Sequence, residues 1–196
     1  MGKLLRLLPL LAMLVTAACA TVPTGGPPRG EAREIAELAA AIAALGPEVD
    51  PEEAARAARI SYDWTHKLAQ DYRITDPPLV HNTKVNMGLK PRGLCWHWAE
   101  DMERRLKQEN FATLEIHRAI ANADNPFRID HSTAIISARG ESMFDGIVLD
   151  PWRKGGVLVW EHTREDTDYA WQPREMVLSE KRARALARSS MQLARP

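Results

Sequence analysis

Apolar side chains recur at helical spacing in the first half of the chain, where two helices are predicted. Residues 31–45 are rich in Ala and are followed by a Gly-Pro pair, which ends a helix. Asp50 can cap a second helix that begins at Pro51 and runs to about Tyr72. The apolar positions of this second helix lie three to four residues apart and should face the core.

The middle of the chain changes from an irregular to a periodic pattern. Residues 73–92 contain three prolines and are predicted to be irregular. From residue 95 to residue 110, apolar side chains form one stripe and charged side chains lie off it, which is typical of an amphipathic helix.

Alternation of apolar and polar residues predicts strands in the second half. Residues 112–121 alternate, and further β-rich runs are 131–138 and 146–149, with 157–160 a candidate for one more strand. A basic helix is predicted at 175–193. Helices that precede a helix and a run of antiparallel strands indicate an α+β fold.

The first 18 residues have the pattern of a secretory signal. Lys3 and Arg6 precede an apolar run that is too short for a membrane span, and small residues follow it. A lipoprotein cleavage site that leaves Cys19 lipidated is favoured over ordinary cleavage after Ala20, and an uncleaved anchor is the weakest alternative. The sequence therefore predicts a protein on the periplasmic side of the bacterial envelope, anchored to a membrane through Cys19.

Beyond the signal, the sequence predicts a tether and one domain. Residues 19–30 are rich in Pro and Gly and predict a flexible tether, and residues 31–196 suit a single domain. The chain of 196 residues has 26 basic and 26 acidic side chains, a balance that does not favour nucleic acid. A cofactor or a metal is not expected, because no Cys-x-x-Cys pair and no ligand-spaced histidines occur.

Cys95 is the most informative single residue. The chain has only two cysteines, and if Cys19 is lipidated or removed, Cys95 is left without a disulfide partner. Such a thiol is either inert and buried or reactive. Cys95 lies at the predicted first turn of a helix, where free backbone N–H groups and the helix dipole favour a thiolate and could bind an oxyanion.

His131 and Asp150 supply the other two groups that cysteine catalysis needs. His131 opens a β-run and should share a face with Thr133, and Asp150 ends the next β-run. A carboxylate there can reach Nδ1 of the imidazole while the other ring nitrogen faces the thiol. The sequence therefore predicts a catalytic triad of Cys95, His131 and Asp150.

The segments around the triad, residues 93–99, 130–133 and 148–152, resemble the transglutaminase-like branch of papain-fold enzymes. The resemblance covers about residues 80–160. It implies a papain-like core, with the cysteine at a helix N-terminus packed on an antiparallel sheet, and acyl transfer through a thioester on Cys95. Bacterial members similar to this chain are mostly exported cysteine peptidases or amidases. Residue 132, after the histidine, is a serine rather than the aromatic residue often found there.

Several residues are candidates for contacts with the substrate, a protein or a peptide that could include the peptide part of the cell wall. Trp96 and Trp152 adjoin triad positions and could line a groove, although aromatic residues also fill cores. The second oxyanion donor is open among His81, Asn82 and Asn86, and Asn82 is also a candidate for substrate binding.

The function predicted is that of an envelope cysteine hydrolase. Three alternatives stay open: a non-catalytic lipoprotein that binds a protein partner through a degenerate papain-like fold, a protein-crosslinking transamidase, and a cell-wall peptidase, whose usual Asp before the cysteine is replaced here by Leu94. The basic run of the last helix could touch anionic lipid, but a solvated helix face is favoured.

Overall fold

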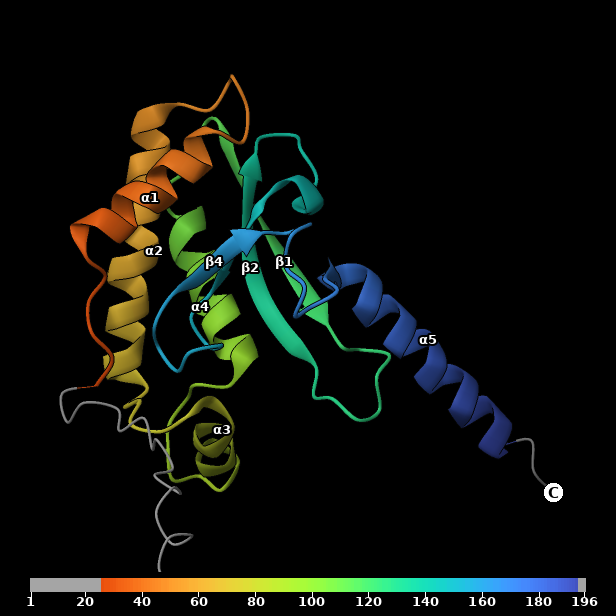
Figure 1. Ribbon diagram of the computed structural model, residues 1–196. Coiled ribbons are helices and arrows are strands. Elements are labelled where there is room, and N and C mark those ends of the chain that lie inside the picture. The colour runs from red at the N-terminus through yellow and green to blue at the C-terminus, as the bar shows by residue number, and fades with distance from the viewer. Residues whose placement is uncertain (1–25, 194–196) are drawn as a thin grey trace, which may run out of the picture.

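The computed structural model describes residues 26–193 and has an α+β fold (Figure 1). The described residues form five α-helices, one 3-10 helix (η1, Met143–Asp145) and five strands. The helices are α1 (Ala32–Ala43), α2 (Pro51–Asp71), α3 (Pro78–Asn86), α4 (Cys95–Lys107) and α5 (Arg174–Leu193), and the strands are β1 (Leu114–Ala121), β2 (His131–Ala138), β3 (Ile147–Asp150), β4 (Val159–His162) and β5 (Gln172–Pro173).

The signal segment expected at residues 1–18 and Cys19 lie outside the described residues. Of the tether expected at residues 19–30, residues 26–30 are described, and Pro27 among them is buried. Within the part of the chain that is described, no helix has both the length and the apolar character needed to cross a membrane.

The strands form one antiparallel sheet in the order β4-β3-β2-β1-β5. β2 is central, and all its side chains are buried. Successive side chains of β2 alternate between two clusters, with Ile136 packed towards the helices and Ile135 on the opposite face. His131, the first residue of β2, shares the face of Ile135, as the sequence pattern predicts.

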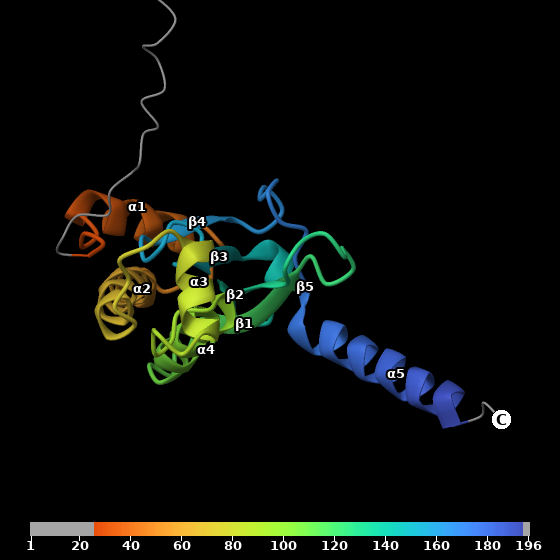
Figure 2. The same cartoon turned by 90° about the horizontal axis from the view of Figure 1, so that it is seen from below.

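Helices α1, α2 and α4 lie on one side of the sheet (Figure 2). The predictions of helices at residues 31–45, 51–72 and 95–110 are confirmed, with the helix ends one to three residues shorter. Asp50 caps α2 as expected, because its Oδ1 accepts a hydrogen bond of 2.7 Å from the backbone N–H of Glu52. Small alanine side chains let α1 and α2 approach closely over a shared apolar core.

The sequence-based assignment of residues 73–92 as irregular is wrong in part, because α3 forms within them. Pro77 and Pro78 are the reason. Proline usually interrupts a helix, but it is well tolerated at the first helical position, where its missing N–H has no intrahelical partner. α3 also lacks a pronounced apolar stripe, so periodicity could not identify it. The two-residue strand β5 was not predicted, and β4 lies two residues later than expected.

Helix α5 projects from the rest of the protein (Figures 1 and 2). It packs on the body only near its start, where Val177 is buried, and its residues from 182 to 192 are exposed. Two of its basic side chains reach the β1–β2 loop (residues 122–130): Lys181 binds Asp130 and Arg184 binds Asp124. The basic run therefore lies on an exposed helix and partly holds this loop.

Candidate active site

Cys95 is the first residue of α4, and its side chain is buried, with 8% of its surface exposed. The turn before it depends on Gly93, whose φ is +124°, a conformation that other residues rarely adopt. A side chain on Gly93 would also collide with the ring of His81. The indole N–H of Trp98 donates to the Gly93 carbonyl at 3.0 Å. The backbone N–H of Cys95 has no acceptor among the described residues, because the first N–H groups of a helix lack intrahelical partners.

His97 caps the start of α4. Its Nδ1 accepts hydrogen bonds from the backbone N–H groups of Gly93 at 3.1 Å and Leu94 at 3.2 Å. A ring nitrogen that accepts must be unprotonated, so the ring is neutral. Burial, and then the charge of Arg92, lower the pKa of His97 from 6.5 to about 4. His97 therefore stabilises the turn that holds Cys95.

Lowering the pH should weaken this cap. Because the unfolded chain binds a proton at His97 near pH 6.5 and the folded chain only near pH 4, the free energy of unfolding should fall as the pH drops across this interval. In His97→Gln, the amide oxygen can still accept from the backbone but does not titrate. Urea unfolding at pH 6.5, 5 and 4 should show a smaller loss of stability in this variant. An equal loss in both proteins would show that His97 is not responsible.

His131 begins β2 and Asp150 ends β3, and both side chains are 1% exposed. Nε2 of His131 lies 2.6 Å from Oδ2 of Asp150. The second carboxylate oxygen of Asp150 accepts from the backbone N–H groups of Trp152 and Arg153, each at 3.1 Å. These bonds fix the carboxylate against the imidazole ring.

The ring nitrogens of His131 have the opposite roles from those predicted. The prediction that Asp150 binds Nδ1 is wrong, because Asp150 binds Nε2. The imidazole ring extends from the first residue of β2, and its outer nitrogen, Nε2, reaches Asp150 on the neighbouring strand β3. Its near nitrogen, Nδ1, stays close to the backbone of Asp130, whose carbonyl oxygen lies 3.5 Å from Sγ of Cys95. Nδ1 is buried and has no hydrogen-bond partner of normal geometry among the described residues.

The charge state of His131 is set by its two neighbours. Burial alone lowers the pKa of His131, but the charge and hydrogen bond of Asp150, with a further contribution from Cys95, raise the pKa from 6.5 to about 9. Because Nε2 faces Asp150, Nδ1 is the ring nitrogen that remains for Cys95, the other neighbour that raises this pKa. The structure thus brings Cys95, His131 and Asp150 together, with the histidine between the thiol and the carboxylate.

A buried ion network supports Asp150. Nε of Arg153 donates to Oδ2 of Asp150 at 3.2 Å, and Nη2 donates to Oδ2 of Asp166 at 2.6 Å. The indole N–H of Trp171 donates to the same Asp166 oxygen at 2.9 Å. Sequence analysis missed Arg153 and Asp166, because charged side chains normally face solvent and no periodic pattern marks them. The position of Arg153, three residues after Asp150, was the only local signal.

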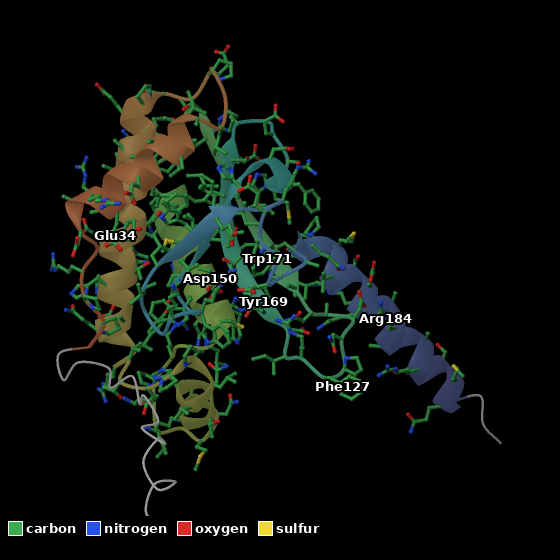
Figure 3. The ribbon with its side chains drawn as sticks, viewed as in Figure 1. Glu34, Phe127, Asp150, Tyr169, Trp171 and Arg184 are labelled. Atoms are coloured by element: carbon green, nitrogen blue, oxygen red, sulfur yellow. The ribbon has the colours of Figure 1, made fainter. Side chains whose placement is uncertain are left out.

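Aromatic rings surround His131. The ring centroids of Tyr169, Trp152 and Trp171 lie 4.5, 4.7 and 5.3 Å from that of His131. The Arg153 guanidinium lies 4.7 Å from the Tyr169 ring centroid. Figure 3 shows Tyr169 and Trp171 beside Asp150. These rings shield the imidazole from solvent, which strengthens its interaction with Asp150.

The other predicted site residues divide into buried and exposed groups. Trp152 is buried, and its indole N–H donates to Oδ1 of Asn82 at 3.0 Å, which brings α3 to the site. Trp96, next to Cys95, is 46% exposed. Nε2 of His81 is 2.9 Å from the Arg92 carbonyl oxygen, so this nitrogen is already engaged, and Asn86 is exposed.

Other features of the described residues do not coincide with this site. A surface pocket of about 460 Å³ lies beside β1, lined by Ile116, Arg118 and Phe144 among others, and no triad residue lines it. Within residues 26–193, no group of three or more His, Cys, Asp or Glu side chains is placed to hold a metal ion. His117 instead lies 2.8 Å from the Ser137 hydroxyl.

Comparisons of the chain with protein-family models, with curated proteins and with solved structures gave no match.

Proposed function

We propose that this protein is a cysteine hydrolase with a papain-like core of the transglutaminase-like type, which cleaves amide bonds in peptides or proteins. One observation carries the proposal: the buried ring of His131 binds Asp150 through Nε2, has Cys95 as its other charged neighbour, and has no hydrogen-bond partner for Nδ1 among residues 26–193. A thiol, a base and an orienting carboxylate in this order are the parts of a nucleophilic triad.

The triad performs the reaction in two halves. Nδ1 of His131 takes the thiol proton, and Sγ of Cys95 attacks the carbonyl carbon of the amide. The carbon–nitrogen bond then breaks, the amine leaves with the proton from His131, and a thioester remains on Cys95. Water next attacks the thioester, His131 takes a proton from this water, and the acid and the free thiol are released. Asp150 holds the ring and stabilises its positive charge throughout.

Two donors are available for the negative oxygen that forms during each attack. The backbone N–H of Cys95, at the helix N-terminus, has no acceptor within residues 26–193. Asn82 is the second candidate, because its Oδ1 accepts from Trp152 while its Nδ2 makes no hydrogen bond among the described residues. His81 is a weaker candidate, since its Nε2 already faces the Arg92 carbonyl.

The N-terminal segment supports a location for the protein and, with it, a set of accessible substrates. The signal segment and Cys19 support a lipid-anchored protein on the periplasmic side of the bacterial envelope, where peptides, proteins and cell-wall peptides are accessible substrates. We favour hydrolysis over transamidation, because cross-linking requires a site that excludes water from the thioester.

The direct test is the pH dependence of alkylation by iodoacetamide. The Cys19→Ser variant leaves Cys95 as the only thiol, so all label incorporated reports on it. At pH 6, Cys95 should react at least about tenfold faster than a free cysteine, which is almost entirely protonated there. Peptide mass spectrometry verifies the labelled residue. A rate that follows free cysteine, or label that enters only in denaturant, would refute an activated thiol.

A non-catalytic binding protein is the second candidate. It is favoured by the low exposure of Cys95 and by the separate pocket beside β1. For this candidate, Cys95 should be as unreactive in the native protein as any buried thiol. The same alkylation experiment therefore decides between the two functions.

A further inference from the structure

Several exposed apolar side chains lie on segments that contact the candidate active site. Most of the large exposed apolar residues in the described chain lie in three short segments: α3 with the turn after it, the start of α4, and the β1–β2 loop. Phe127, at 95% exposed, is the extreme case. Exposed apolar side chains around a site are typical of an interaction surface. We call six of these side chains the site rim: Leu79, Met87, Leu89, Trp96, Phe127 and Ile129.

The α3 side of the rim is attached to the site by specific contacts. Nε2 of His81 lies 2.9 Å from the carbonyl oxygen of Arg92, and the ring packs against Gly93. Asn82 accepts the indole N–H of Trp152, whose ring lies 4.7 Å from that of His131. Leu79 precedes these two residues on α3, and its side chain is exposed.

The β1–β2 loop forms the opposite side. Sγ of Cys95 contacts the carbonyl oxygen of Asp130, the last residue of this loop, and Ile129 precedes it. Figures 1 and 2 both place α3 on one side of the start of β2 and this loop on the other. Figure 3 shows Phe127 at the outer end of the loop, away from the core. The two sides of the rim therefore flank Cys95.

The side chain of Phe127 is exposed and does not anchor its own loop, although its backbone N–H donates to Oδ1 of Asn125 at 2.9 Å. Polar contacts hold the loop instead: the Arg128 guanidinium donates to the Asp168 carbonyl at 3.3 Å, and Arg184 of α5 binds Asp124 at 3.0 Å. The side-chain amide of Asn122 donates to the Ile129 carbonyl at 3.2 Å. The Phe127 ring is therefore available for contact with a ligand.

We infer that the site rim binds an extended polypeptide segment with large apolar side chains on both sides of the amide bond presented to Cys95. Because Cys95 is buried to 92%, only a thin ligand such as an extended backbone can reach it. Side chains on either side of that bond then reach the two walls of the rim. This inference rests on the proposed function, since it assigns the substrate class of the same site.

Binding is tested separately from catalysis in the Cys95→Ala variant of the full chain. The probes are a panel of fluorescent nine-residue peptides with Leu, Phe or Met on both sides of the central bond, and a matching panel with Ser or Gln instead. Fluorescence anisotropy should show that apolar peptides bind at least about fivefold more tightly than their polar counterparts. Phe127→Ser and Leu89→Ser should each weaken this binding by at least about fivefold, and these exposed positions tolerate polar residues.

Met191→Ser is the matched control, because Met191 is as exposed as Leu89 but lies on α5, away from the rim. It should leave binding unchanged. Equal binding of the apolar and polar panels, or equal effects of all three substitutions, overturns the inference. Phosphatidylcholine vesicles are the second arm, with Cys19→Ser added so that no lipid anchor contributes: if Phe127→Ser and Leu89→Ser weaken sedimentation with vesicles but not peptide binding, the rim is a membrane-facing surface instead. Peptide binding without an activated thiol would refute the proposed function and leave the rim intact.

Discussion

Replacing His131 with Ala should lower the rate at which iodoacetamide alkylates Cys95 at pH 7 by at least about tenfold. A free cysteine is only a few per cent thiolate at this pH, whereas a thiol paired with a protonated imidazole is largely thiolate, and the lower intrinsic nucleophilicity of such a thiolate removes part of the gain. His131 can supply this charge because its pKa is raised to about 9. Asp150→Asn should shift the rate profile to more alkaline pH, because it removes the charge that offsets the burial of the ring.

Two further variants make this result interpretable. His131→Gln fills much of the space of the imidazole without supplying a base, so it separates loss of charge from loss of packing. His117→Ala removes a histidine from the adjacent strand β1, where it bonds to Ser137, and should leave the rate unchanged. If His131→Ala, His131→Gln and His117→Ala all react like the unmodified protein while remaining folded, Cys95 has no catalytic partner.

The Arg153→Met variant should lose about 3–5 kcal/mol of unfolding free energy at pH 7. Arg153 is the shared cation of Asp150 and Asp166, whose side chains are each 1% exposed. Burial by itself raises the pKa of Asp166, but Arg153 and Trp171 together bring it below its ordinary value. Without Arg153, the buried carboxylate of Asp166 loses its cationic partner and Asp150 keeps only His131. Arg153→Lys should lose less, because the ammonium keeps the charge but cannot bridge both carboxylates.

The stability deficit of Arg153→Met should depend on pH. A lowered pKa for Asp166 contributes stability that is present above its ordinary pKa of about 3.8 and lost as the pH falls below it. The deficit of Arg153→Met should therefore be largest near pH 7 and shrink in acid, as measured by urea unfolding. Lys154→Met is the matched control, since it removes the same charge from an exposed neighbour. A difference of less than about 1 kcal/mol between the two variants would contradict the role of Arg153.

Strong local signals explain which elements the sequence could predict. Asp50 and Pro51 define the start of α2 through backbone chemistry alone. Alternation predicts β1, and a run of residues that favour strands predicts β2. The sequence did not predict α3, because Pro77 and Pro78 are compatible with both a loop and a helix start. Which of the two occurs depends on tertiary contacts, such as that between His81 and the Arg92 carbonyl.

Only the site residues that lie at the ends of helices and strands could be predicted from the sequence. Cys95, His131 and Asp150 each lie at the first or last residue of a helix or strand, so the order of elements along the chain was enough to bring them together. The identity of the histidine nitrogen that faces Asp150 depends on a ring torsion, which no pattern encodes. Arg153 and Asp166 pair across a loop, so their burial depends on how residues 151–171 return to the sheet.

The pairing of β2 with β3 has a consequence for the newly made chain. Ala134 pairs with Leu149 and Ile136 with Ile147, and this register sets the face on which Asp150 meets His131. A slip of one residue would turn Asp150 to the opposite face of the sheet and away from the imidazole. We therefore expect Cys95 to become reactive only when this hairpin has formed in the correct register. In a nascent or partly folded chain, Cys95 should have the reactivity of an ordinary cysteine and should not react with other proteins.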